Sequence, residues 1–108
     1  MGDGTEPYQI GAAWQRIVAA LIDEELKLAE VILLESVTHK IDPLFVLALM
    51  KTESTFNNWS RSFNGALGLM QILPSTGEEL ASELNMRWKG EGTLFDPFAN
   101  VKMGVSYF

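Results

Sequence analysis

The feature that most constrains the fold is the apolar run from Leu44 to Met50, which directly follows Asp42-Pro43. An aspartate that accepts hydrogen bonds from the first N–H groups of a helix, followed by proline at the first helical position, is a strong signal for a helix start. The sequence therefore predicts a helix from about Pro43 to Ser54. Because this helix is apolar on every side between Leu44 and Met50, we expect it to run through the middle of the domain.

Helical patterns also flank this segment. Between Tyr8 and His39 apolar residues recur at helical spacing, which predicts one long helix or, with Asp23-Glu24-Glu25 as a new start, two consecutive helices. The stripe comprises Trp14, which is expected in the core, and Ile17, Val18, Leu21, Ile22, Leu26, Ala29, Leu33 and Val37. Further helices are predicted after Pro74 and from Asp96-Pro97 onward, whereas residues 55–68 and 89–93 have loop compositions. No strand pattern is present, so the predicted fold class is all-α.

The composition excludes several classes of function. The chain has 108 residues and a net charge of −6 with no basic run, which argues against nucleic acid as a partner. It has no cysteine, and its single histidine, His39, has no partner cluster, so neither a metal nor a cofactor is predicted.

No apolar run approaches the roughly 20 residues of a membrane span. No signal peptide is visible, so the chain is expected to be cytoplasmic or to lack its natural N-terminus. The oligomeric state stays open.

Glu53, in the last turn of the predicted central helix, is the candidate catalytic residue. It lies on the same helix face as Leu49 and Met50, and both partial burial and the negative end of the helix favour its protonated form. A glutamic acid that keeps its proton near neutral pH is what glycoside cleavage requires of a general acid. The competing interpretation is a carboxylate at a frayed helix end, solvated or paired with Lys51 or Arg61.

Four ordered sequence elements sharpen this interpretation. They are Glu53-Ser54-Thr55-Phe56, then Ser62, then Gly65-Ala66-Leu67-Gly68-Leu69-Met70-Gln71 followed by Pro74-Ser75-Thr76, and finally the segment from Asn100 to Phe108 with its N-I/V-x-x-G-x-x-Y pattern. In this order and at these separations they resemble the soluble lytic transglycosylase (SLT) family of lysozyme-like domains. The resemblance covers about residues 26–108.

The resemblance implies an enzyme that cuts the β-1,4 bond between N-acetylmuramic acid and N-acetylglucosamine in peptidoglycan glycan strands. Glu53 would be the catalytic acid and base, and the product would carry a 1,6-anhydromuramic acid end. The substrate-binding residues would be Ser62, Gln71, Met70, Gly68 and, with packing as an equal alternative, Trp59. Because peptidoglycan lies outside the cytoplasm, the resemblance also implies a periplasmic or other extracytoplasmic location.

The chain also departs from the family pattern. In the family another helix and an A-Y-N-A-G motif follow the tyrosine motif, and this chain contains neither. We therefore expect a lysozyme-like domain whose C-terminal part is missing: residues 1–7 a disordered or artificial N-terminus, 8–25 an N-terminal helix and 26–108 the SLT domain. Leu73 replaces a frequent methionine and is expected to alter a sugar-facing surface. Weak or absent lytic activity is expected. The alternative function is a non-catalytic module that binds peptidoglycan, or a secretion or phage-tail partner, through an incomplete cleft.

Overall fold

The computed structural model describes the backbone of residues 5–108, and side chains from residue 15 onward except those of residues 17, 18 and 21. Over this range the chain forms helices and isolated β-bridges but no strand, which confirms the predicted all-α class. The helices are α1 (Thr5–Thr38), α2 (Pro43–Ser54), α3 (Pro74–Glu83), α4 (Glu91–Phe95) and α5 (Pro97–Tyr107).

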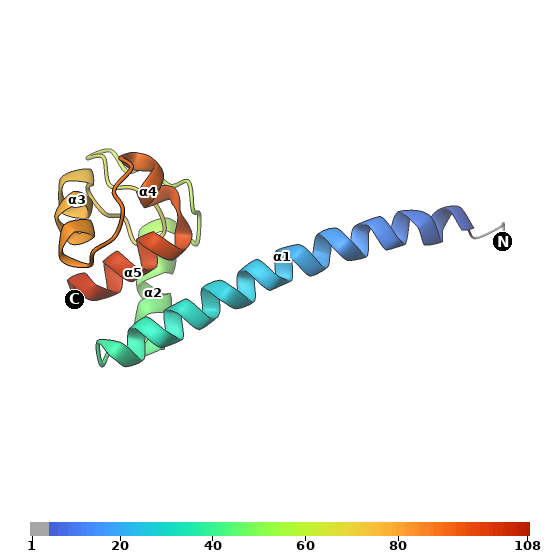
Figure 1. Cartoon of the computed structure of the whole chain (residues 1–108), viewed down its shortest axis with the longest axis horizontal. Helices are drawn as coiled ribbons and strands as arrows, with labels where there is room; N and C mark the ends of the chain where they lie inside the picture. Colours follow the sequence, from blue (N-terminus) through green and yellow to red (C-terminus); the bar gives the residue numbers. More distant parts are fainter. Residues whose placement is uncertain (1–4) are drawn as a thin grey trace.

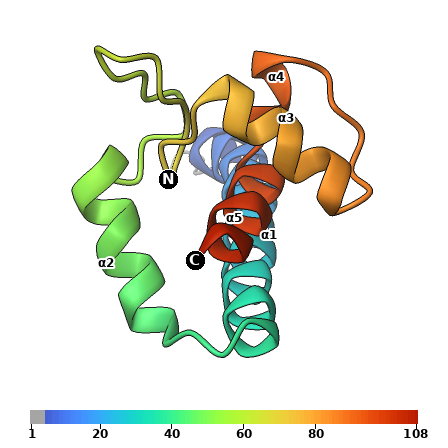
Figure 2. The same cartoon turned by 90° about the vertical axis from the view of Figure 1, so that its left-hand side faces the viewer.

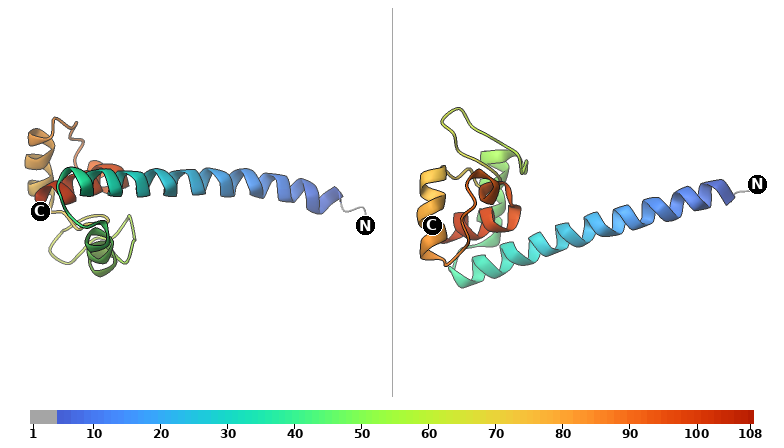
Figure 3. Two further views of the ribbon diagram at one scale, coloured as in Figure 1. Left: turned by 90° about the horizontal axis from the view of Figure 1, so that it is seen from below. Right: turned by 45° about the horizontal axis from the view of Figure 1, so that its top comes forward.

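α1 is a single helix whose N-terminal part projects far from the other helices (Figure 1). Two further views show the same projection (Figure 3), and the molecule measures 59 × 28 × 27 Å. Asp23-Glu24-Glu25 therefore lie within a continuous helix rather than starting a second one. The C-terminal part of α1 packs against α2 and α5 through a side that includes Leu28, Ile32 and Ser36. The predicted core position of Trp14 lies outside the described side chains.

α2 starts where the sequence predicts, but its position in the fold differs from the prediction. Asp42 Oδ1 accepts a hydrogen bond from Leu44 N at 2.9 Å, and Pro43 occupies the first turn. The buried residues of α2 are Val46, Met50 and Ser54. The other side is open, and Leu44 is 71% exposed. The prediction that α2 runs through the middle was wrong, because this helix lies at the edge of the domain with neighbours on one side (Figure 2).

α5 takes the central position instead, between α2 and α3 (Figure 2). Asp96 Oδ1 accepts hydrogen bonds from Phe98 N at 2.9 Å and Ala99 N at 3.3 Å, so the Asp-Pro signal again marks a helix start. The buried residues of α5 are Asn100, Val101, Met103, Gly104 and Val105. The hydrophobic core therefore forms where α5 meets α1, one side of α2, and the segment 66–72.

The connection between α2 and α3 ends in a tight turn that positions the site. Leu67 and Ile72 exchange backbone hydrogen bonds of 2.9 and 3.0 Å, and the predicted turn before them has Gly65 at φ 90°. The expected second loop was partly wrong, because α4 occupies its end. There Thr93 Oγ1 accepts a hydrogen bond from Lys89 N at 2.8 Å, a local contact that composition does not reveal.

Candidate active site

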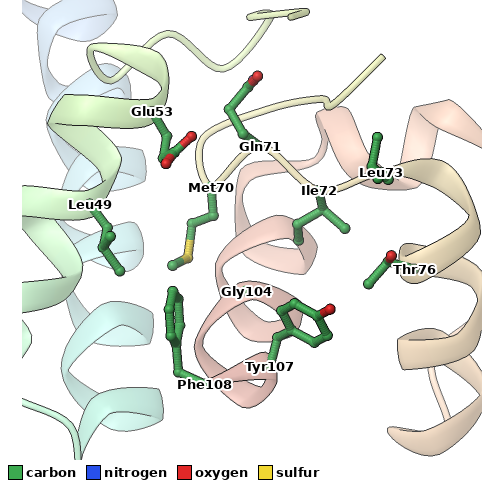
Figure 4. Close-up of a pocket in the computed structure, with 10 residues that line it drawn as sticks. All are labelled: Leu49, Glu53, Met70, Gln71, Ile72, Leu73, Thr76, Gly104, Tyr107 and Phe108. Carbon is green, nitrogen blue, oxygen red and sulfur yellow. The ribbon is translucent and has the colours of Figure 1, made fainter. Parts of the chain in front are cut away.

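A pocket of about 270 Å³ opens between the end of α2, the segment after the tight turn, the start of α3 and the end of α5 (Figure 4). The lining residues are Leu49, Glu53, Met70, Gln71, Ile72, Leu73, Thr76, Gly104, Tyr107 and Phe108. Most are apolar, and Glu53 is the one acidic residue among them. An apolar pocket with a small number of polar groups is the usual form of a small-molecule site.

Glu53 reaches the pocket from the last turn of α2, one turn after Leu49. In Figure 4 its carboxylate is directed toward the segment that carries Met70 and Gln71. The side chain is exposed, so the predicted partial burial was wrong. The alternative pairing with Arg61 is not found among the described residues either, because Arg61 Nη2 contacts Glu91 Oε1 at 2.9 Å instead.

Gln71 is held on the pocket wall by hydrogen bonds to its own loop. Its backbone adopts the left-handed region at φ 53°. Its Nε2 donates to the carbonyl oxygens of Gly68 at 2.9 Å and Ser60 at 3.2 Å. Its Oε1 accepts no hydrogen bond from the part of the chain that the structure describes. The amide oxygen is therefore the polar atom of Gln71 that remains for a ligand.

Asn100, fully buried in the first turn of α5, fixes the segment that carries Met70. Its Oδ1 accepts a hydrogen bond from Met70 N at 2.7 Å. Its Nδ2 donates to the carbonyl oxygens of Leu67 at 3.0 Å and Leu94 at 2.8 Å. Buried polar groups need such partners, so one side chain satisfies three backbone groups at once. The motif spacing pointed to Asn100 but predicted no role for it.

Two glycines permit close packing, Gly104 in the pocket wall and Gly68 behind it. A Cβ atom at Gly68 would collide with the Asn100 side chain and the Leu94 carbonyl, and the φ of Gly68 is 79°. A Cβ atom at Gly104 would stand 2.8 Å from Met70 Cβ, closer than side chains tolerate. Gly68 thus allows the close backbone approach expected of it, but from a buried position behind the pocket wall.

Ser62 and Trp59 lie on the loop outside the pocket lining. Ser62 Oγ accepts a hydrogen bond from Ala66 N at 3.0 Å and also contacts Asn64 Oδ1. Trp59 is 69% exposed, and its ring centroid lies 5.4 Å from that of Phe95. The predicted site residues that the pocket brings together are therefore Glu53, Met70 and Gln71.

Other pocket residues were missed or only partly predicted from the sequence. Leu73, expected on a sugar-facing surface, does line the pocket. The sequence could have predicted Leu49 as a pocket residue, because it precedes Glu53 by four residues and so lies on the same helix face. Thr76 and Phe108 belong to the motif elements, but no site role was predicted for them, because they meet the pocket only through the packing of α3 and α5 beside α2.

The shortest described ion pair, Arg61–Glu91 at 2.9 Å, lies outside the pocket. The Arg61 guanidinium, by its hydrogen bonds and charge, lowers the pKa of Glu91 below the usual range for glutamate, and Glu91 raises the pKa of Arg61. Within the described residues, histidine and carboxylate side chains form no group of three that could hold a metal ion. None of the helices described here combines the length and apolarity needed to cross a membrane.

The all-α fold and the glutamate at the end of α2 agree with the lysozyme-like transglycosylase domain that the motifs resemble. The family model for the transglycosylase SLT domain matches residues 30–108, so the chain belongs to the transglycosylase SLT domain family.

The curated proteins that are similar to this chain are named as lytic murein transglycosylases. The chain is 41% identical over 69 residues to membrane-bound lytic murein transglycosylase C of Mannheimia succiniciproducens, which covers 62% of this chain and 19% of that protein. It is 36% identical over 67 residues to a putative soluble lytic murein transglycosylase of Haemophilus influenzae, with 62% of this chain and 11% of the relative covered. The chain thus spans about a fifth or less of the length of these curated relatives.

Solved structures show the same similarity. The 70 kDa soluble lytic transglycosylase of Escherichia coli superposes with a TM-score of 0.66 at 29% identity, covering 72% of this chain and 13% of that one. An inactive mutant of the lytic transglycosylase Slt of Pseudomonas aeruginosa gives the same TM-score at 26% identity, with the same coverage.

Proposed function

We propose that this chain carries the catalytic glutamate of a peptidoglycan lytic transglycosylase. The observation that supports it most is that Glu53, which the SLT pattern makes catalytic, lines the pocket opposite Met70 and Gln71. Family membership supports the same reaction class. The substrate would be the β-1,4 bond between N-acetylmuramic acid and N-acetylglucosamine in glycan strands.

In the proposed reaction Glu53 acts first as acid and then as base. Its protonated carboxyl gives a proton to the glycosidic oxygen, and the bond from that oxygen to the anomeric carbon of muramic acid breaks. The muramic acid 6-hydroxyl oxygen then bonds to the anomeric carbon and returns its proton to Glu53. The products are a free N-acetylglucosamine 4-hydroxyl and a 1,6-anhydromuramic acid end, with no water consumed.

A single carboxylate is consistent with this route. Most glycosidases use two carboxylates at a set separation, but substrate-assisted enzymes are exceptions because a neighbouring acetamido oxygen stabilises the oxocarbenium-like centre. No second carboxylate lines the described pocket. Asp42 and Asp96, which are also carboxylates of the domain, are engaged as helix caps.

The remaining predicted residues take roles that match their positions. In the proposal Gln71 Oε1 accepts a hydrogen bond from a sugar hydroxyl or amide, and Met70 forms part of the apolar wall. Ser62 and Gly68 act from outside the pocket, by shaping the loop that holds these two residues. Trp59, exposed on the same loop, offers its ring to a glycan strand that extends beyond the pocket. The reaction would take place outside the cytoplasm, where peptidoglycan lies.

Mass spectrometry of muropeptides released from purified peptidoglycan tests the proposal, because it detects weak cleavage that turbidity clearing does not. We expect 1,6-anhydromuramic acid ends with the wild-type chain and with the control variant Glu79→Gln, which changes an exposed glutamate of α3. Glu53→Gln should produce none above the untreated level. New reducing ends instead of anhydro ends would identify a hydrolase and overturn the proposed product.

The exposure of Glu53 favours one competing function, a module that binds peptidoglycan without cleaving it, because the pocket does not enclose this carboxylate. A pull-down on intact cell walls separates the two. Binding by both wild type and Glu53→Gln, with no new glycan ends from either, would support the module.

A further inference from the structure

A second apolar surface runs along α1, on a side that the other helices do not cover. Its residues are Ile22, Leu26, Ala29, Leu33 and Val37, which we name the α1 stripe. All are exposed, with Leu26 at 59% and Val37 at 71%. Successive spacings of four, three, four and four residues place them on one face of the helix. A contiguous exposed apolar face of this kind marks an interaction surface.

The α1 stripe is distinct from the face by which α1 packs on the domain. The packed face carries Leu28 and Ile32, which lie roughly a third of a turn around the helix from the stripe. The SLT family model matches from residue 30 onward, so Ile22, Leu26 and Ala29 lie on a part of α1 that the matched domain does not include. In Figures 1 and 3 the start of α1 projects away from the other helices. Farther along, Glu25 and Leu28 on the packed side line a pocket with Phe98 at the start of α5.

Charges beside the α1 stripe restrict what can cover it. With Leu26 and Leu33 as a positions of a heptad, the e positions before them are Asp23 and Glu30. The g positions before them are Glu25 and Ile32, of which Ile32 is buried against the domain, so the charged residues at these positions are all acidic. The one lysine nearby, Lys27, contacts Asp23 at 3.0 Å. Its pKa is raised by that hydrogen bond and by the charges of Asp23, Glu24 and Glu30, which reflects the acidic surroundings.

These acidic borders argue against a second copy of the chain as the occupant. In a parallel pair Glu25 would face Glu30 of the other copy, and in an antiparallel pair each acidic border would face itself. Like charges at these positions act against pairing, whereas opposite charges select a partner.

We propose that the α1 stripe is a docking surface for an amphipathic helix of another protein, whose apolar seam is bordered by lysine or arginine. Leu26 and Leu33 would form the centre of the interface. Asp23, Glu25 and Glu30 would form ion pairs at its rim. This interaction does not use Glu53 or the pocket. Its test is therefore independent of the test of the proposed reaction.

Two designed helical peptides of about 21 residues test this surface in fluorescence anisotropy titrations. Both carry isoleucine and leucine at the seam; one has lysine at the bordering positions and the other has glutamate. We expect the full chain to bind the lysine peptide at least about tenfold more tightly than the glutamate peptide. The charge-reversed chain Asp23→Lys/Glu30→Lys should reverse this preference.

Matched variants locate the binding face. Leu26→Glu should weaken binding of the lysine peptide by about tenfold or more, because it puts a charge into an apolar seam. The control Leu34→Glu changes a leucine of similar exposure, 63%, that lies off the α1 stripe, and should bind as wild type does. Circular dichroism confirms that each variant folds, and Glu53→Gln should bind normally.

Three results would overturn the proposal. They are equal binding of the two peptides, equal losses from Leu26→Glu and Leu34→Glu, and a self-associated chain in sedimentation equilibrium that Leu26→Glu dissociates. The last would assign the α1 stripe to a second copy of this chain.

Discussion

Replacement of Asn100 by alanine tests whether one buried amide holds the pocket wall. The substitution would leave Met70 N and the carbonyl oxygens of Leu67 and Leu94 without their hydrogen-bond partner. Each buried polar group that loses its partner costs about 1–3 kcal/mol. With partial relaxation and entry of water, we expect the free energy of unfolding to fall by about 4 kcal/mol.

That loss is a large fraction of the total, because a domain of this length has a free energy of unfolding of about 5–15 kcal/mol. In urea unfolding followed by far-ultraviolet circular dichroism, an m-value of about 1.5 kcal/mol/M converts the loss into a midpoint lower by about 2–3 M. Lys102→Ala is the matched control, since it changes an exposed residue of the same helix, and should move the free energy of unfolding by less than about 0.5 kcal/mol. An Asn100→Ala midpoint equal to that of the control would refute the role assigned to this side chain.

Two further predictions concern the pocket and its surroundings. Gly104→Ala would force the added methyl group against Met70 Cβ. We therefore expect the free energy of unfolding, measured in urea, to fall by about 1–3 kcal/mol and cleavage to be weaker. An unchanged unfolding midpoint would show that Met70 moves freely. The Arg61–Glu91 pair lowers the pKa of Glu91, so the stability that it adds is present above the ordinary glutamate pKa and is lost as pH falls through the lowered value. Urea midpoints of wild type and Glu91→Gln should therefore differ at neutral pH and converge well below about pH 4; a difference that persists at low pH would contradict this.

The starts of α2 and α5 could be predicted from the sequence, because the Asp-Pro pairs that mark them act on neighbouring residues only. Asp42 and Asp96 each cap a helix through a contact with a residue two positions ahead, and such contacts need no tertiary structure. The α3 helix begins at Pro74 itself, slightly before the predicted start, and no side chain caps it.

The burial of each helix could not be predicted in the same way. The apolar composition of residues 44–50 suggested a central helix, but which element lies at the centre depends on how many neighbours pack around it, and α5 has more of them than α2. Burial was also the part of the Glu53 prediction that was wrong. Its helix face follows from its spacing to Leu49, whereas its exposure depends on which elements pack around α2. Asn100 could be singled out by motif spacing, but its partners Leu67, Met70 and Leu94 are brought to it only by the folded chain.

The central claim is that Glu53 drives cleavage in which the muramic acid 6-hydroxyl, and not water, closes on the anomeric carbon. Cleavage of peptidoglycan in water enriched in the heavy oxygen isotope, with the new glycan ends analysed by mass spectrometry, tests it most directly. We predict new ends that contain no heavy oxygen with the wild-type chain, and no new ends with Glu53→Gln. Incorporation of heavy oxygen into the new ends, or equal cleavage by Glu53→Gln, would contradict the claim.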